Sequence, residues 1–126
     1  MARASVRYFV NDVDEAIGFY ERLGFEVEMH PVPAFAMLGR DGLRLILNAP
    51  GAGGGAGRAL ADGTLPTPGG WNRFQLEVAD LDASVQQLQD AGVAFRSGIN
   101  EGIGGRQIVA DDPSGNPVEL FQPVAR

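Results

Sequence analysis

The chain contains no cysteine and only one histidine, His30, among its 126 residues. Without cysteine it can form no disulfide framework, no thiolate metal site and no cysteine nucleophile. No serine lies near a histidine in the sequence, so a serine hydrolase triad is not expected. His30 falls near the end of a predicted strand, and we interpret it as an ordinary surface residue.

The chain also lacks an excess of basic residues and any long apolar run. Its formal net charge of −6 argues against a nucleic-acid partner, because such proteins usually carry a basic surface. No run approaches the roughly 18 apolar residues of a membrane span, and the start, MARASVRYFV, has no long apolar segment. We therefore expect no membrane partner and a cytoplasmic protein. An apolar fraction of 44% predicts a folded globular protein, here a single domain over residues 1–126.

What the chain does have is an internal repeat. Residues 5–25 match a later segment without a gap at a shift of 68 residues. Residues 42–50 match 115–123 at a shift of 73, so the second copy holds five additional residues, which we place in 97–105. A period this long indicates two fused modules and not a solenoid.

Each module is predicted to run strand, helix, strand, strand, strand. Alternating apolar residues predict the opening strands, around 5–10 and 73–78. Asp14 and Asp82 are predicted to cap the helices, which end at Gly24 and Gly92. The other strands are predicted at 26–30, 34–38 and 43–48 in the first module, and at 93–96, 107–110 and 118–122 in the second.

These elements place module one at residues 4–50 and module two at 71–123, joined by a linker over 51–70. The linker is rich in glycine and proline and too long for a tight connection, so we expect it to be mobile or to lie over a ligand site. Its GAGGGAG stretch lacks the Lys-Ser/Thr of a phosphate-binding loop and is interpreted as flexible.

The repeated pattern, the Asp-x-Asp helix starts, FYERLGF and DDPSGNPVELFQP together resemble the vicinal oxygen chelate superfamily. This superfamily contains glyoxalase I, extradiol dioxygenases and binding proteins of the bleomycin-resistance type. The resemblance covers nearly the whole chain. It implies an α+β fold of two tandem βαβββ modules, whose curled mixed sheets surround a cleft that a second subunit commonly completes. We therefore expect a homodimer.

Catalytic members of that superfamily hold a divalent metal with one residue from the first and last strand of each module, usually His, Glu, His and Glu. By register these places fall here on Ser5, Ile46, Arg73 and Glu119. Ile46 cannot bind a metal, Arg73 is a cation and Ser5 is a poor ligand. Since Zn²⁺, Fe²⁺ or Mn²⁺ needs three or four nitrogen or oxygen donors, we predict no metal and no other cofactor.

Side chains of the same parity as these four places share their side of each sheet. They mix aromatic and apolar groups with a few polar ones, as small-molecule pockets do. The predicted ligand-binding residues are Arg7, Phe9, Phe35, Met37, Arg44, Ile46, Asn48, Trp71, Arg73, Gln75, Glu119 and Phe121. For the strand that holds Phe35 and Met37, the opposite parity is also open. No residue is predicted to be catalytic.

Two functions follow from this lining. The favoured one is metal-independent binding or sequestration of a bulky, partly aromatic small molecule, as in bleomycin resistance, for antibiotic self-resistance or drug binding. The alternative is a metal-free lyase or isomerase, in which Glu119 acts as general acid or base and Arg73 stabilises an oxyanion. Arg73 and Glu119 can equally form an ion pair that only fixes the strands. A metal-dependent glyoxalase or dioxygenase is disfavoured.

Overall fold

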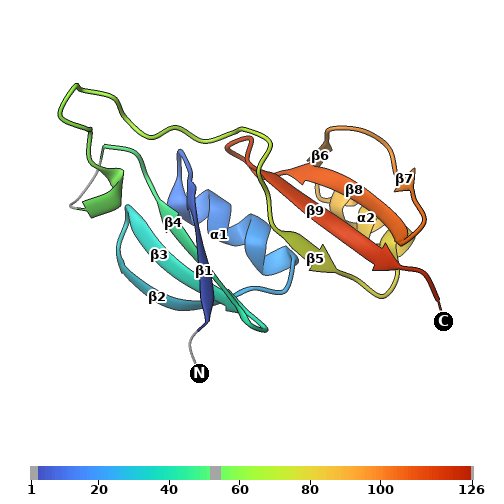
Figure 1. Ribbon diagram of the computed structural model, residues 1–126. Helices are drawn as coiled ribbons and strands as arrows, with labels where there is room; N and C mark the ends of the chain where they lie inside the picture. Colours follow the sequence, from blue (N-terminus) through green and yellow to red (C-terminus); the bar gives the residue numbers. More distant parts are fainter. Residues whose placement is uncertain (1–2, 52–54, 126) are drawn as a thin grey trace. The chain divides into compact units, whose positions relative to one another are not determined.

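The computed structural model describes residues 3–51 and 55–125, so residues 52–54 of the predicted linker lie outside the described residues. The chain divides into two compact units, Met1–Gly69 and Gly70–Arg126. Each unit contains one long helix and one mixed sheet, which confirms the predicted α+β fold of two βαβββ modules (Figure 1). Among the described residues, neither helix is both long and apolar enough to cross a membrane.

The first unit has a four-stranded sheet in the order β1-β4-β3-β2, in which only β1 and β4 run parallel. Tyr8, Leu38, Leu45 and Leu47 are buried on the face that packs against α1. The opposite face is not covered by a helix of this unit. Its elements are β1 (Ala4–Phe9), α1 (Val13–Arg22), β2 (Glu26–Val32), β3 (Phe35–Arg40), β4 (Leu43–Asn48) and the short 3₁₀ helix η1 (Gly55–Gly57).

The second unit repeats this plan with one additional strand. Its sheet has the order β5-β9-β8-β6, and β7 pairs with β8. The additional strand lies in the segment where the sequence places five inserted residues, and a tight turn joins it to β8, with the Gly102 amide donating to the Gly105 carbonyl at 2.8 Å. The elements are β5 (Gln75–Glu77), α2 (Leu81–Asp90), β6 (Ala94–Phe95), β7 (Asn100–Glu101), β8 (Gly105–Asp111) and β9 (Pro117–Pro123).

The predicted helix caps are wrong by two residues. Asp12 caps α1 by accepting the Glu15 amide at 3.0 Å, and Asp80 caps α2 by accepting the Ala83 amide at 3.0 Å. Each helix begins directly after its cap. The first helical residue, Val13 in α1 and Leu81 in α2, is apolar and buried, and this burial fixes the first turn. Asp14 and Asp82 instead lie in the first turns, where a negative charge favours the helix dipole.

The other boundaries agree more closely with the sequence. The predicted helix ends are confirmed: Gly24 and Gly92 have φ of 89° and 83°, and glycine adopts this left-handed conformation without steric cost. The predicted strand at 43–48 coincides with β4, and β2, β3, β8 and β9 extend beyond their predicted ends. The strands β5 and β6 are shorter than predicted.

Candidate functional site

The open face of the first sheet is built from alternate residues of three adjacent strands. Cross-strand pairing brings Arg7, Ile46 and Met37 into one row, and Phe9, Asn48 and Phe35 into the next. Ala36 and Leu38, which alternate with Phe35 and Met37, are fully buried on the helix side. The parity that the sequence left open is therefore the one that places Phe35 and Met37 beside Ile46.

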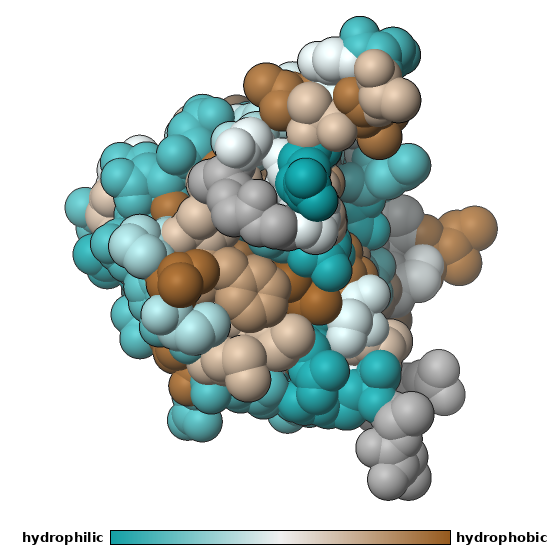
Figure 2. Space-filling view, turned by 90° about the vertical axis from the view of Figure 1, so that its left-hand side faces the viewer, coloured by the Kyte–Doolittle hydropathy of each residue, from teal (hydrophilic) through white to brown (hydrophobic). Residues whose placement is uncertain are grey.

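This face has an apolar centre with one polar pair. Ile46 is 8% exposed, while Phe9, Phe35 and Met37 are partly exposed. Asn48, 5% exposed, accepts a short hydrogen bond from the Arg7 guanidinium. Figure 2 shows hydrophobic side chains gathered on the side of the unit where β2 and β3 lie, bordered by hydrophilic ones. Such a surface can hold an apolar ring and orient it through few polar contacts.

A charged group lies at the end of this face where β1 begins. Arg3 contacts both carboxylate oxygens of Glu28, at 2.6 and 2.8 Å. Hydrogen bonding to Arg3 holds the pKa of the Glu28 carboxyl below its ordinary value and raises the pKa of Arg3. Arg44, from β4, reaches the same carboxylate at 3.8 Å, beyond hydrogen-bond distance.

On the open face of the second sheet, Glu119 is the centre of a polar group. Its Oε1 accepts from Arg73 Nε at 3.0 Å, with Arg73 Nη2 at 2.9 Å, and its Oε2 accepts from Gln75 Nε2 at 2.6 Å. The side chain of Glu119 is only 14% exposed. The Arg73–Glu119 ion pair that the sequence allowed is therefore formed, and each carboxylate oxygen accepts a hydrogen bond.

A pocket of about 270 Å³ lies next to this group. Gln107 pairs with Phe121 across β8 and β9, and the Gln107 Oε1 is buried with no hydrogen-bond partner among the described residues. A buried acceptor of this kind is suited to a ligand donor. The lining residues are Asn100, Glu101, Gly102, Gly104, Gly105, Gln107, Glu119 and Phe121. Sequence reasoning missed Gln107, although its pairing with the strand of Phe121 gives it the same parity.

Trp71 lies at the start of the second unit and is 71% exposed. Its ring lies 4.5 Å from the guanidinium carbon of Arg96, a cation–π contact. Arg96 is held by Asp111 at 2.7 Å and by the carbonyls of Gly70 and Gly115 at 2.7 and 3.0 Å. Sequence reasoning predicted Trp71 as a ligand-binding residue and missed Arg96, which fixes the segment that carries Trp71.

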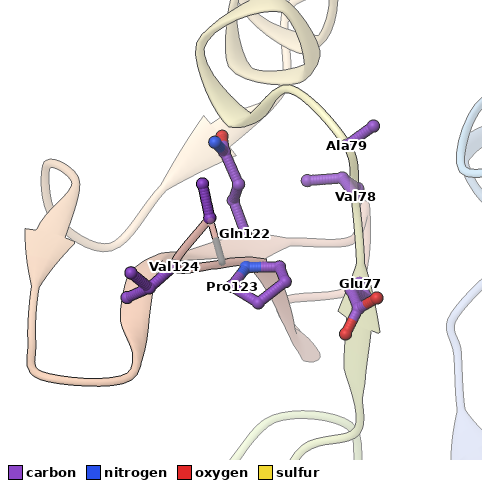
Figure 3. Close-up of a pocket in the computed structure, with 7 residues that line it drawn as sticks. Glu77, Val78, Ala79, Gln122, Pro123 and Val124 are labelled. Atoms are coloured by element: carbon purple, nitrogen blue, oxygen red, sulfur yellow. The ribbon is translucent and has the colours of Figure 1, made fainter.

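A further pocket, of about 360 Å³, lies where β5 leads into α2 (Figure 3). Gln122 extends from β9 toward the helix, and its side-chain oxygen accepts the Leu81 amide at 2.7 Å. Gln122 therefore supports the start of α2. The lining residues are Glu77, Val78, Ala79, Gln122, Pro123, Val124 and Ala125. None of them belongs to the predicted ligand-binding set, and no pair of them is arranged for acid–base chemistry.

At the four positions that the resemblance assigns to metal ligands, the side chains of this chain do not form a metal-binding set. In the first unit these are the hydroxyl of Ser5 and the aliphatic side chain of Ile46; in the second, Glu119 is paired with the cation Arg73. Over residues 3–51 and 55–125, no three His, Cys, Asp or Glu side chains are grouped as a metal site requires. His30 lies 3.6 Å from Asp14, away from these places.

Comparison with known proteins agrees with this architecture. A solved lactoylglutathione lyase from Agrobacterium tumefaciens is 20% identical, covering 96% of this chain and 92% of its own, with a TM-score of 0.72. TnmS3, an antibiotic binding protein from Streptomyces sp. CB03234, is 26% identical, covering 98% and 97%, with a TM-score of 0.72. An uncharacterized protein of Mycolicibacterium smegmatis is 28% identical over 91% of this chain and 88% of its own. The sequence profile of the Glyoxalase/Bleomycin resistance protein/Dioxygenase superfamily matches residues 3–120, and the chain belongs to this superfamily.

Proposed function

We propose that the protein binds and sequesters a bulky, partly aromatic small molecule without a metal ion, in the manner of an antibiotic-binding protein. The observation that carries this proposal is the open face of the first sheet, where Phe9, Phe35, Met37 and Ile46 surround the Arg7–Asn48 hydrogen bond. Aromatic and thioether side chains adapt well to ring systems. The similarity to TnmS3, an antibiotic binding protein, supports a small-molecule ligand.

The contacts of Glu119 favour binding over catalysis. A general base needs a free lone pair within reach of the proton that it removes. Arg73 and Gln75 donate to the two oxygens of Glu119 and leave lone pairs on them, so these contacts account for Glu119 as an anchor between strands without giving it a catalytic role. The alternative is a metal-free lyase or isomerase. It is retained because the fold is similar to that of a lactoylglutathione lyase.

We also propose that the protein works as a homodimer. The edge strands β1 and β2 of the first sheet carry mostly exposed residues, and β2 contributes the exposed hydrophobic side chains Val27, Met29 and Val32. β2 also carries Glu26, Glu28 and Pro31, which protect an open edge from strand pairing, so the exposed hydrophobic side chains and not the edge itself support a partner. Size-exclusion chromatography with light scattering should give about twice the 13.3 kDa of one chain. A mass of one chain across a wide concentration range would contradict the dimer.

The binding proposal is tested by titrating the purified protein with a panel of aromatic natural products, followed by calorimetry and mass analysis of the recovered ligand. A bound ligand should return chemically unchanged. Phe9→Ala and Phe35→Ala should each weaken binding by roughly 1–3 kcal/mol, the range for loss of an aromatic contact. Glu21→Ala is the control, because Glu21 is exposed on α1, on the helix side of the same sheet and outside the proposed ligand and dimer surfaces.

Glu119→Gln separates binding from catalysis. A sequestering protein should retain most of its affinity in this variant, whereas an enzyme should bind and lose turnover. Chelator treatment should leave the melting temperature unchanged. Conversion of a ligand by the natural protein, lost in Glu119→Gln, would favour the enzyme. Failure of every aromatic compound to bind would refute the proposed function.

A further inference from the structure

Three guanidinium groups lie toward one end of the open face of the first sheet, together with the carboxylates of Glu28 and of Glu26, which pairs with Gly39 in the row of Arg44. Arg3, Arg7 and Arg44 are basic, and Glu28 forms ion-pair contacts with Arg3 and Arg44. The whole chain carries a formal charge of −6, so this local excess of positive charge is opposite in sign to the net charge of the chain. Exposed charges farther apart than about 8 Å are largely screened at physiological salt, so the local groups decide what binds here.

The carboxylate of Glu28 forms a hydrogen-bonded ion pair with Arg3. Two parallel contacts of 2.6 and 2.8 Å join them in a bidentate pair. Gly39 makes room for this pair, because a Cβ at that position would lie 2.1 Å from Glu28 Oε2 and 3.0 Å from Arg3 Nη1. Arg44 Nε lies 3.8 Å from Glu28 Oε1, an ion-pair contact that is too long for a hydrogen bond.

Arg7 and Arg44 keep unused donors. The Arg44 Nε is buried and has no hydrogen-bond partner among the described residues. Arg7 donates to the neutral Asn48 and, in the part of the chain that the structure describes, pairs with no carboxylate. Each guanidinium offers five N–H donors, and a desolvated donor without an acceptor costs free energy. Both side chains are therefore suited to bind an anionic group of a ligand by donating hydrogen bonds to it.

The register places these two groups beside the apolar centre. Ser5 pairs with Arg44 and Arg7 pairs with Ile46, so the two arginines are diagonal neighbours on one face, within reach of each other's long side chains. We propose that Arg7 and Arg44 form a subsite for an anionic group, a carboxylate, sulfonate or phosphate, on the ligand whose ring system lies against Ile46, Met37 and the neighbouring aromatic residues. This inference rests on the proposed function and names the ligand class: an aromatic anion.

Two fluorescent dyes test it: 1-anilinonaphthalene-8-sulfonate and its neutral counterpart N-phenyl-1-naphthylamine. They share their aromatic rings and differ in the sulfonate. The natural protein should bind the sulfonate dye at least about tenfold more tightly, and added salt should reduce this preference. Arg7→Gln and Arg44→Gln should each weaken sulfonate binding about tenfold and change binding of the neutral dye less than about twofold.

Two further variants sharpen the test. Glu28→Gln removes the competing carboxylate and should strengthen sulfonate binding severalfold. Arg44→Lys keeps the charge without the planar fork and should give an intermediate affinity. Arg106→Gln is the matched control, because Arg106 is paired with Asp82 in the second unit; it should leave both dyes unaffected. Circular dichroism confirms that each variant is folded before dye is added.

The outcomes are distinct. Preference for the sulfonate dye that both arginine variants abolish supports the anion subsite. Equal binding of the two dyes, unchanged in Arg7→Gln and Arg44→Gln, would overturn the subsite while leaving the proposed function intact. Binding of neither dye would contradict the proposed function and the subsite together.

Discussion

Gly105 is the position where a single added methyl group should do the most damage near the second open face. It begins β8, pairs with Pro123 and lines the pocket beside Gln107. A Cβ at this position would lie 2.3 Å from the Gln122 carbonyl oxygen and 2.9 to 3.0 Å from ring carbons of Phe121. The φ of Gly105 is 156°, at the edge of the region that L residues rarely adopt.

The magnitude of the effect of Gly105→Ala follows from what must move. A side-chain clash is relieved by a new rotamer, but the Gln122 carbonyl belongs to the backbone of β9 and can shift only with the strand. Overpacking by one methyl group costs about 1–3 kcal/mol, and a rigid backbone neighbour places this site at the upper end. We expect a loss of about 2–3 kcal/mol in the free energy of unfolding, or about 8–12 °C in melting temperature.

Urea unfolding followed by circular dichroism measures this loss, and Gly104→Ala is the matched control. A Cβ at Gly104 would meet nothing within 4 Å, so that variant should be neutral or slightly more stable. The displaced Phe121 ring should also weaken any ligand bound at this pocket. Equal stabilities of Gly105→Ala and Gly104→Ala would refute the close packing of β8 against β9 on which the reasoning depends.

Three other predictions concern acid pH, a helix cap and Trp71. Arg3 and Arg106 lower the pKa values of Glu28 and Asp82 below their ordinary 4.5 and 3.8, so these pairs stabilise the fold above those values. Melting temperature should be constant above about pH 5 and fall below about pH 4 as the carboxylates gain protons, and an unchanged melting temperature at pH 3 would contradict this. Asp80→Ala should cost about 1 kcal/mol in urea unfolding through loss of the α2 cap, whereas Asp82→Ala should cost less. Trp71→Ala should lower the free energy of unfolding by about 0.5–1 kcal/mol, the contribution of an exposed cation–π contact. Arg96→Ala should lower it more, because that variant also loses the hydrogen bonds to Asp111 and to two backbone carbonyls. Equal losses in the two variants would contradict this order.

Most of the fold could be predicted because the chain repeats its own pattern. Alternating apolar residues locate strands, and glycine ends both helices at equivalent places. The sequence Asp-x-Ser-Gly-Asn at 112–116 also favours a turn, and Asp112 Oδ1 accepts the amides of Ser114 and Asn116 at 2.9 Å there. The helix caps were misplaced because each Asp-x-Asp offers two candidates, and burial of Val13 and Leu81 decides between them.

Less of the candidate site could be predicted, because parity gives the face of a side chain but not its partner. Parity placed Arg73, Gln75 and Glu119 on one side, and they are bonded there. Parity could not indicate that Arg3, which lies outside the strands, hydrogen-bonds to Glu28 while Arg44 stays 3.8 Å from it. That outcome depends on a missing side chain at Gly39 in another strand. Arg96 was missed because its contacts join residues distant in sequence.

The two units differ in how they depart from a metal-binding pattern, and the difference bears on function. In the second unit, Arg73 supplies a positive charge beside Glu119, so the carboxylate is neutralised by the protein itself. In the first unit, Ile46 brings no charge at all and adds apolar area between Arg7 and Met37. An apolar residue there adds no carboxylate beside Arg7 and Arg44, and Glu28 is hydrogen-bonded to Arg3 and lies 3.8 Å from Arg44 Nε. The first unit therefore offers both an apolar surface and neighbouring guanidinium groups, of which Arg44 Nε is buried without a hydrogen-bond partner among the described residues, and an aromatic anion requires this combination.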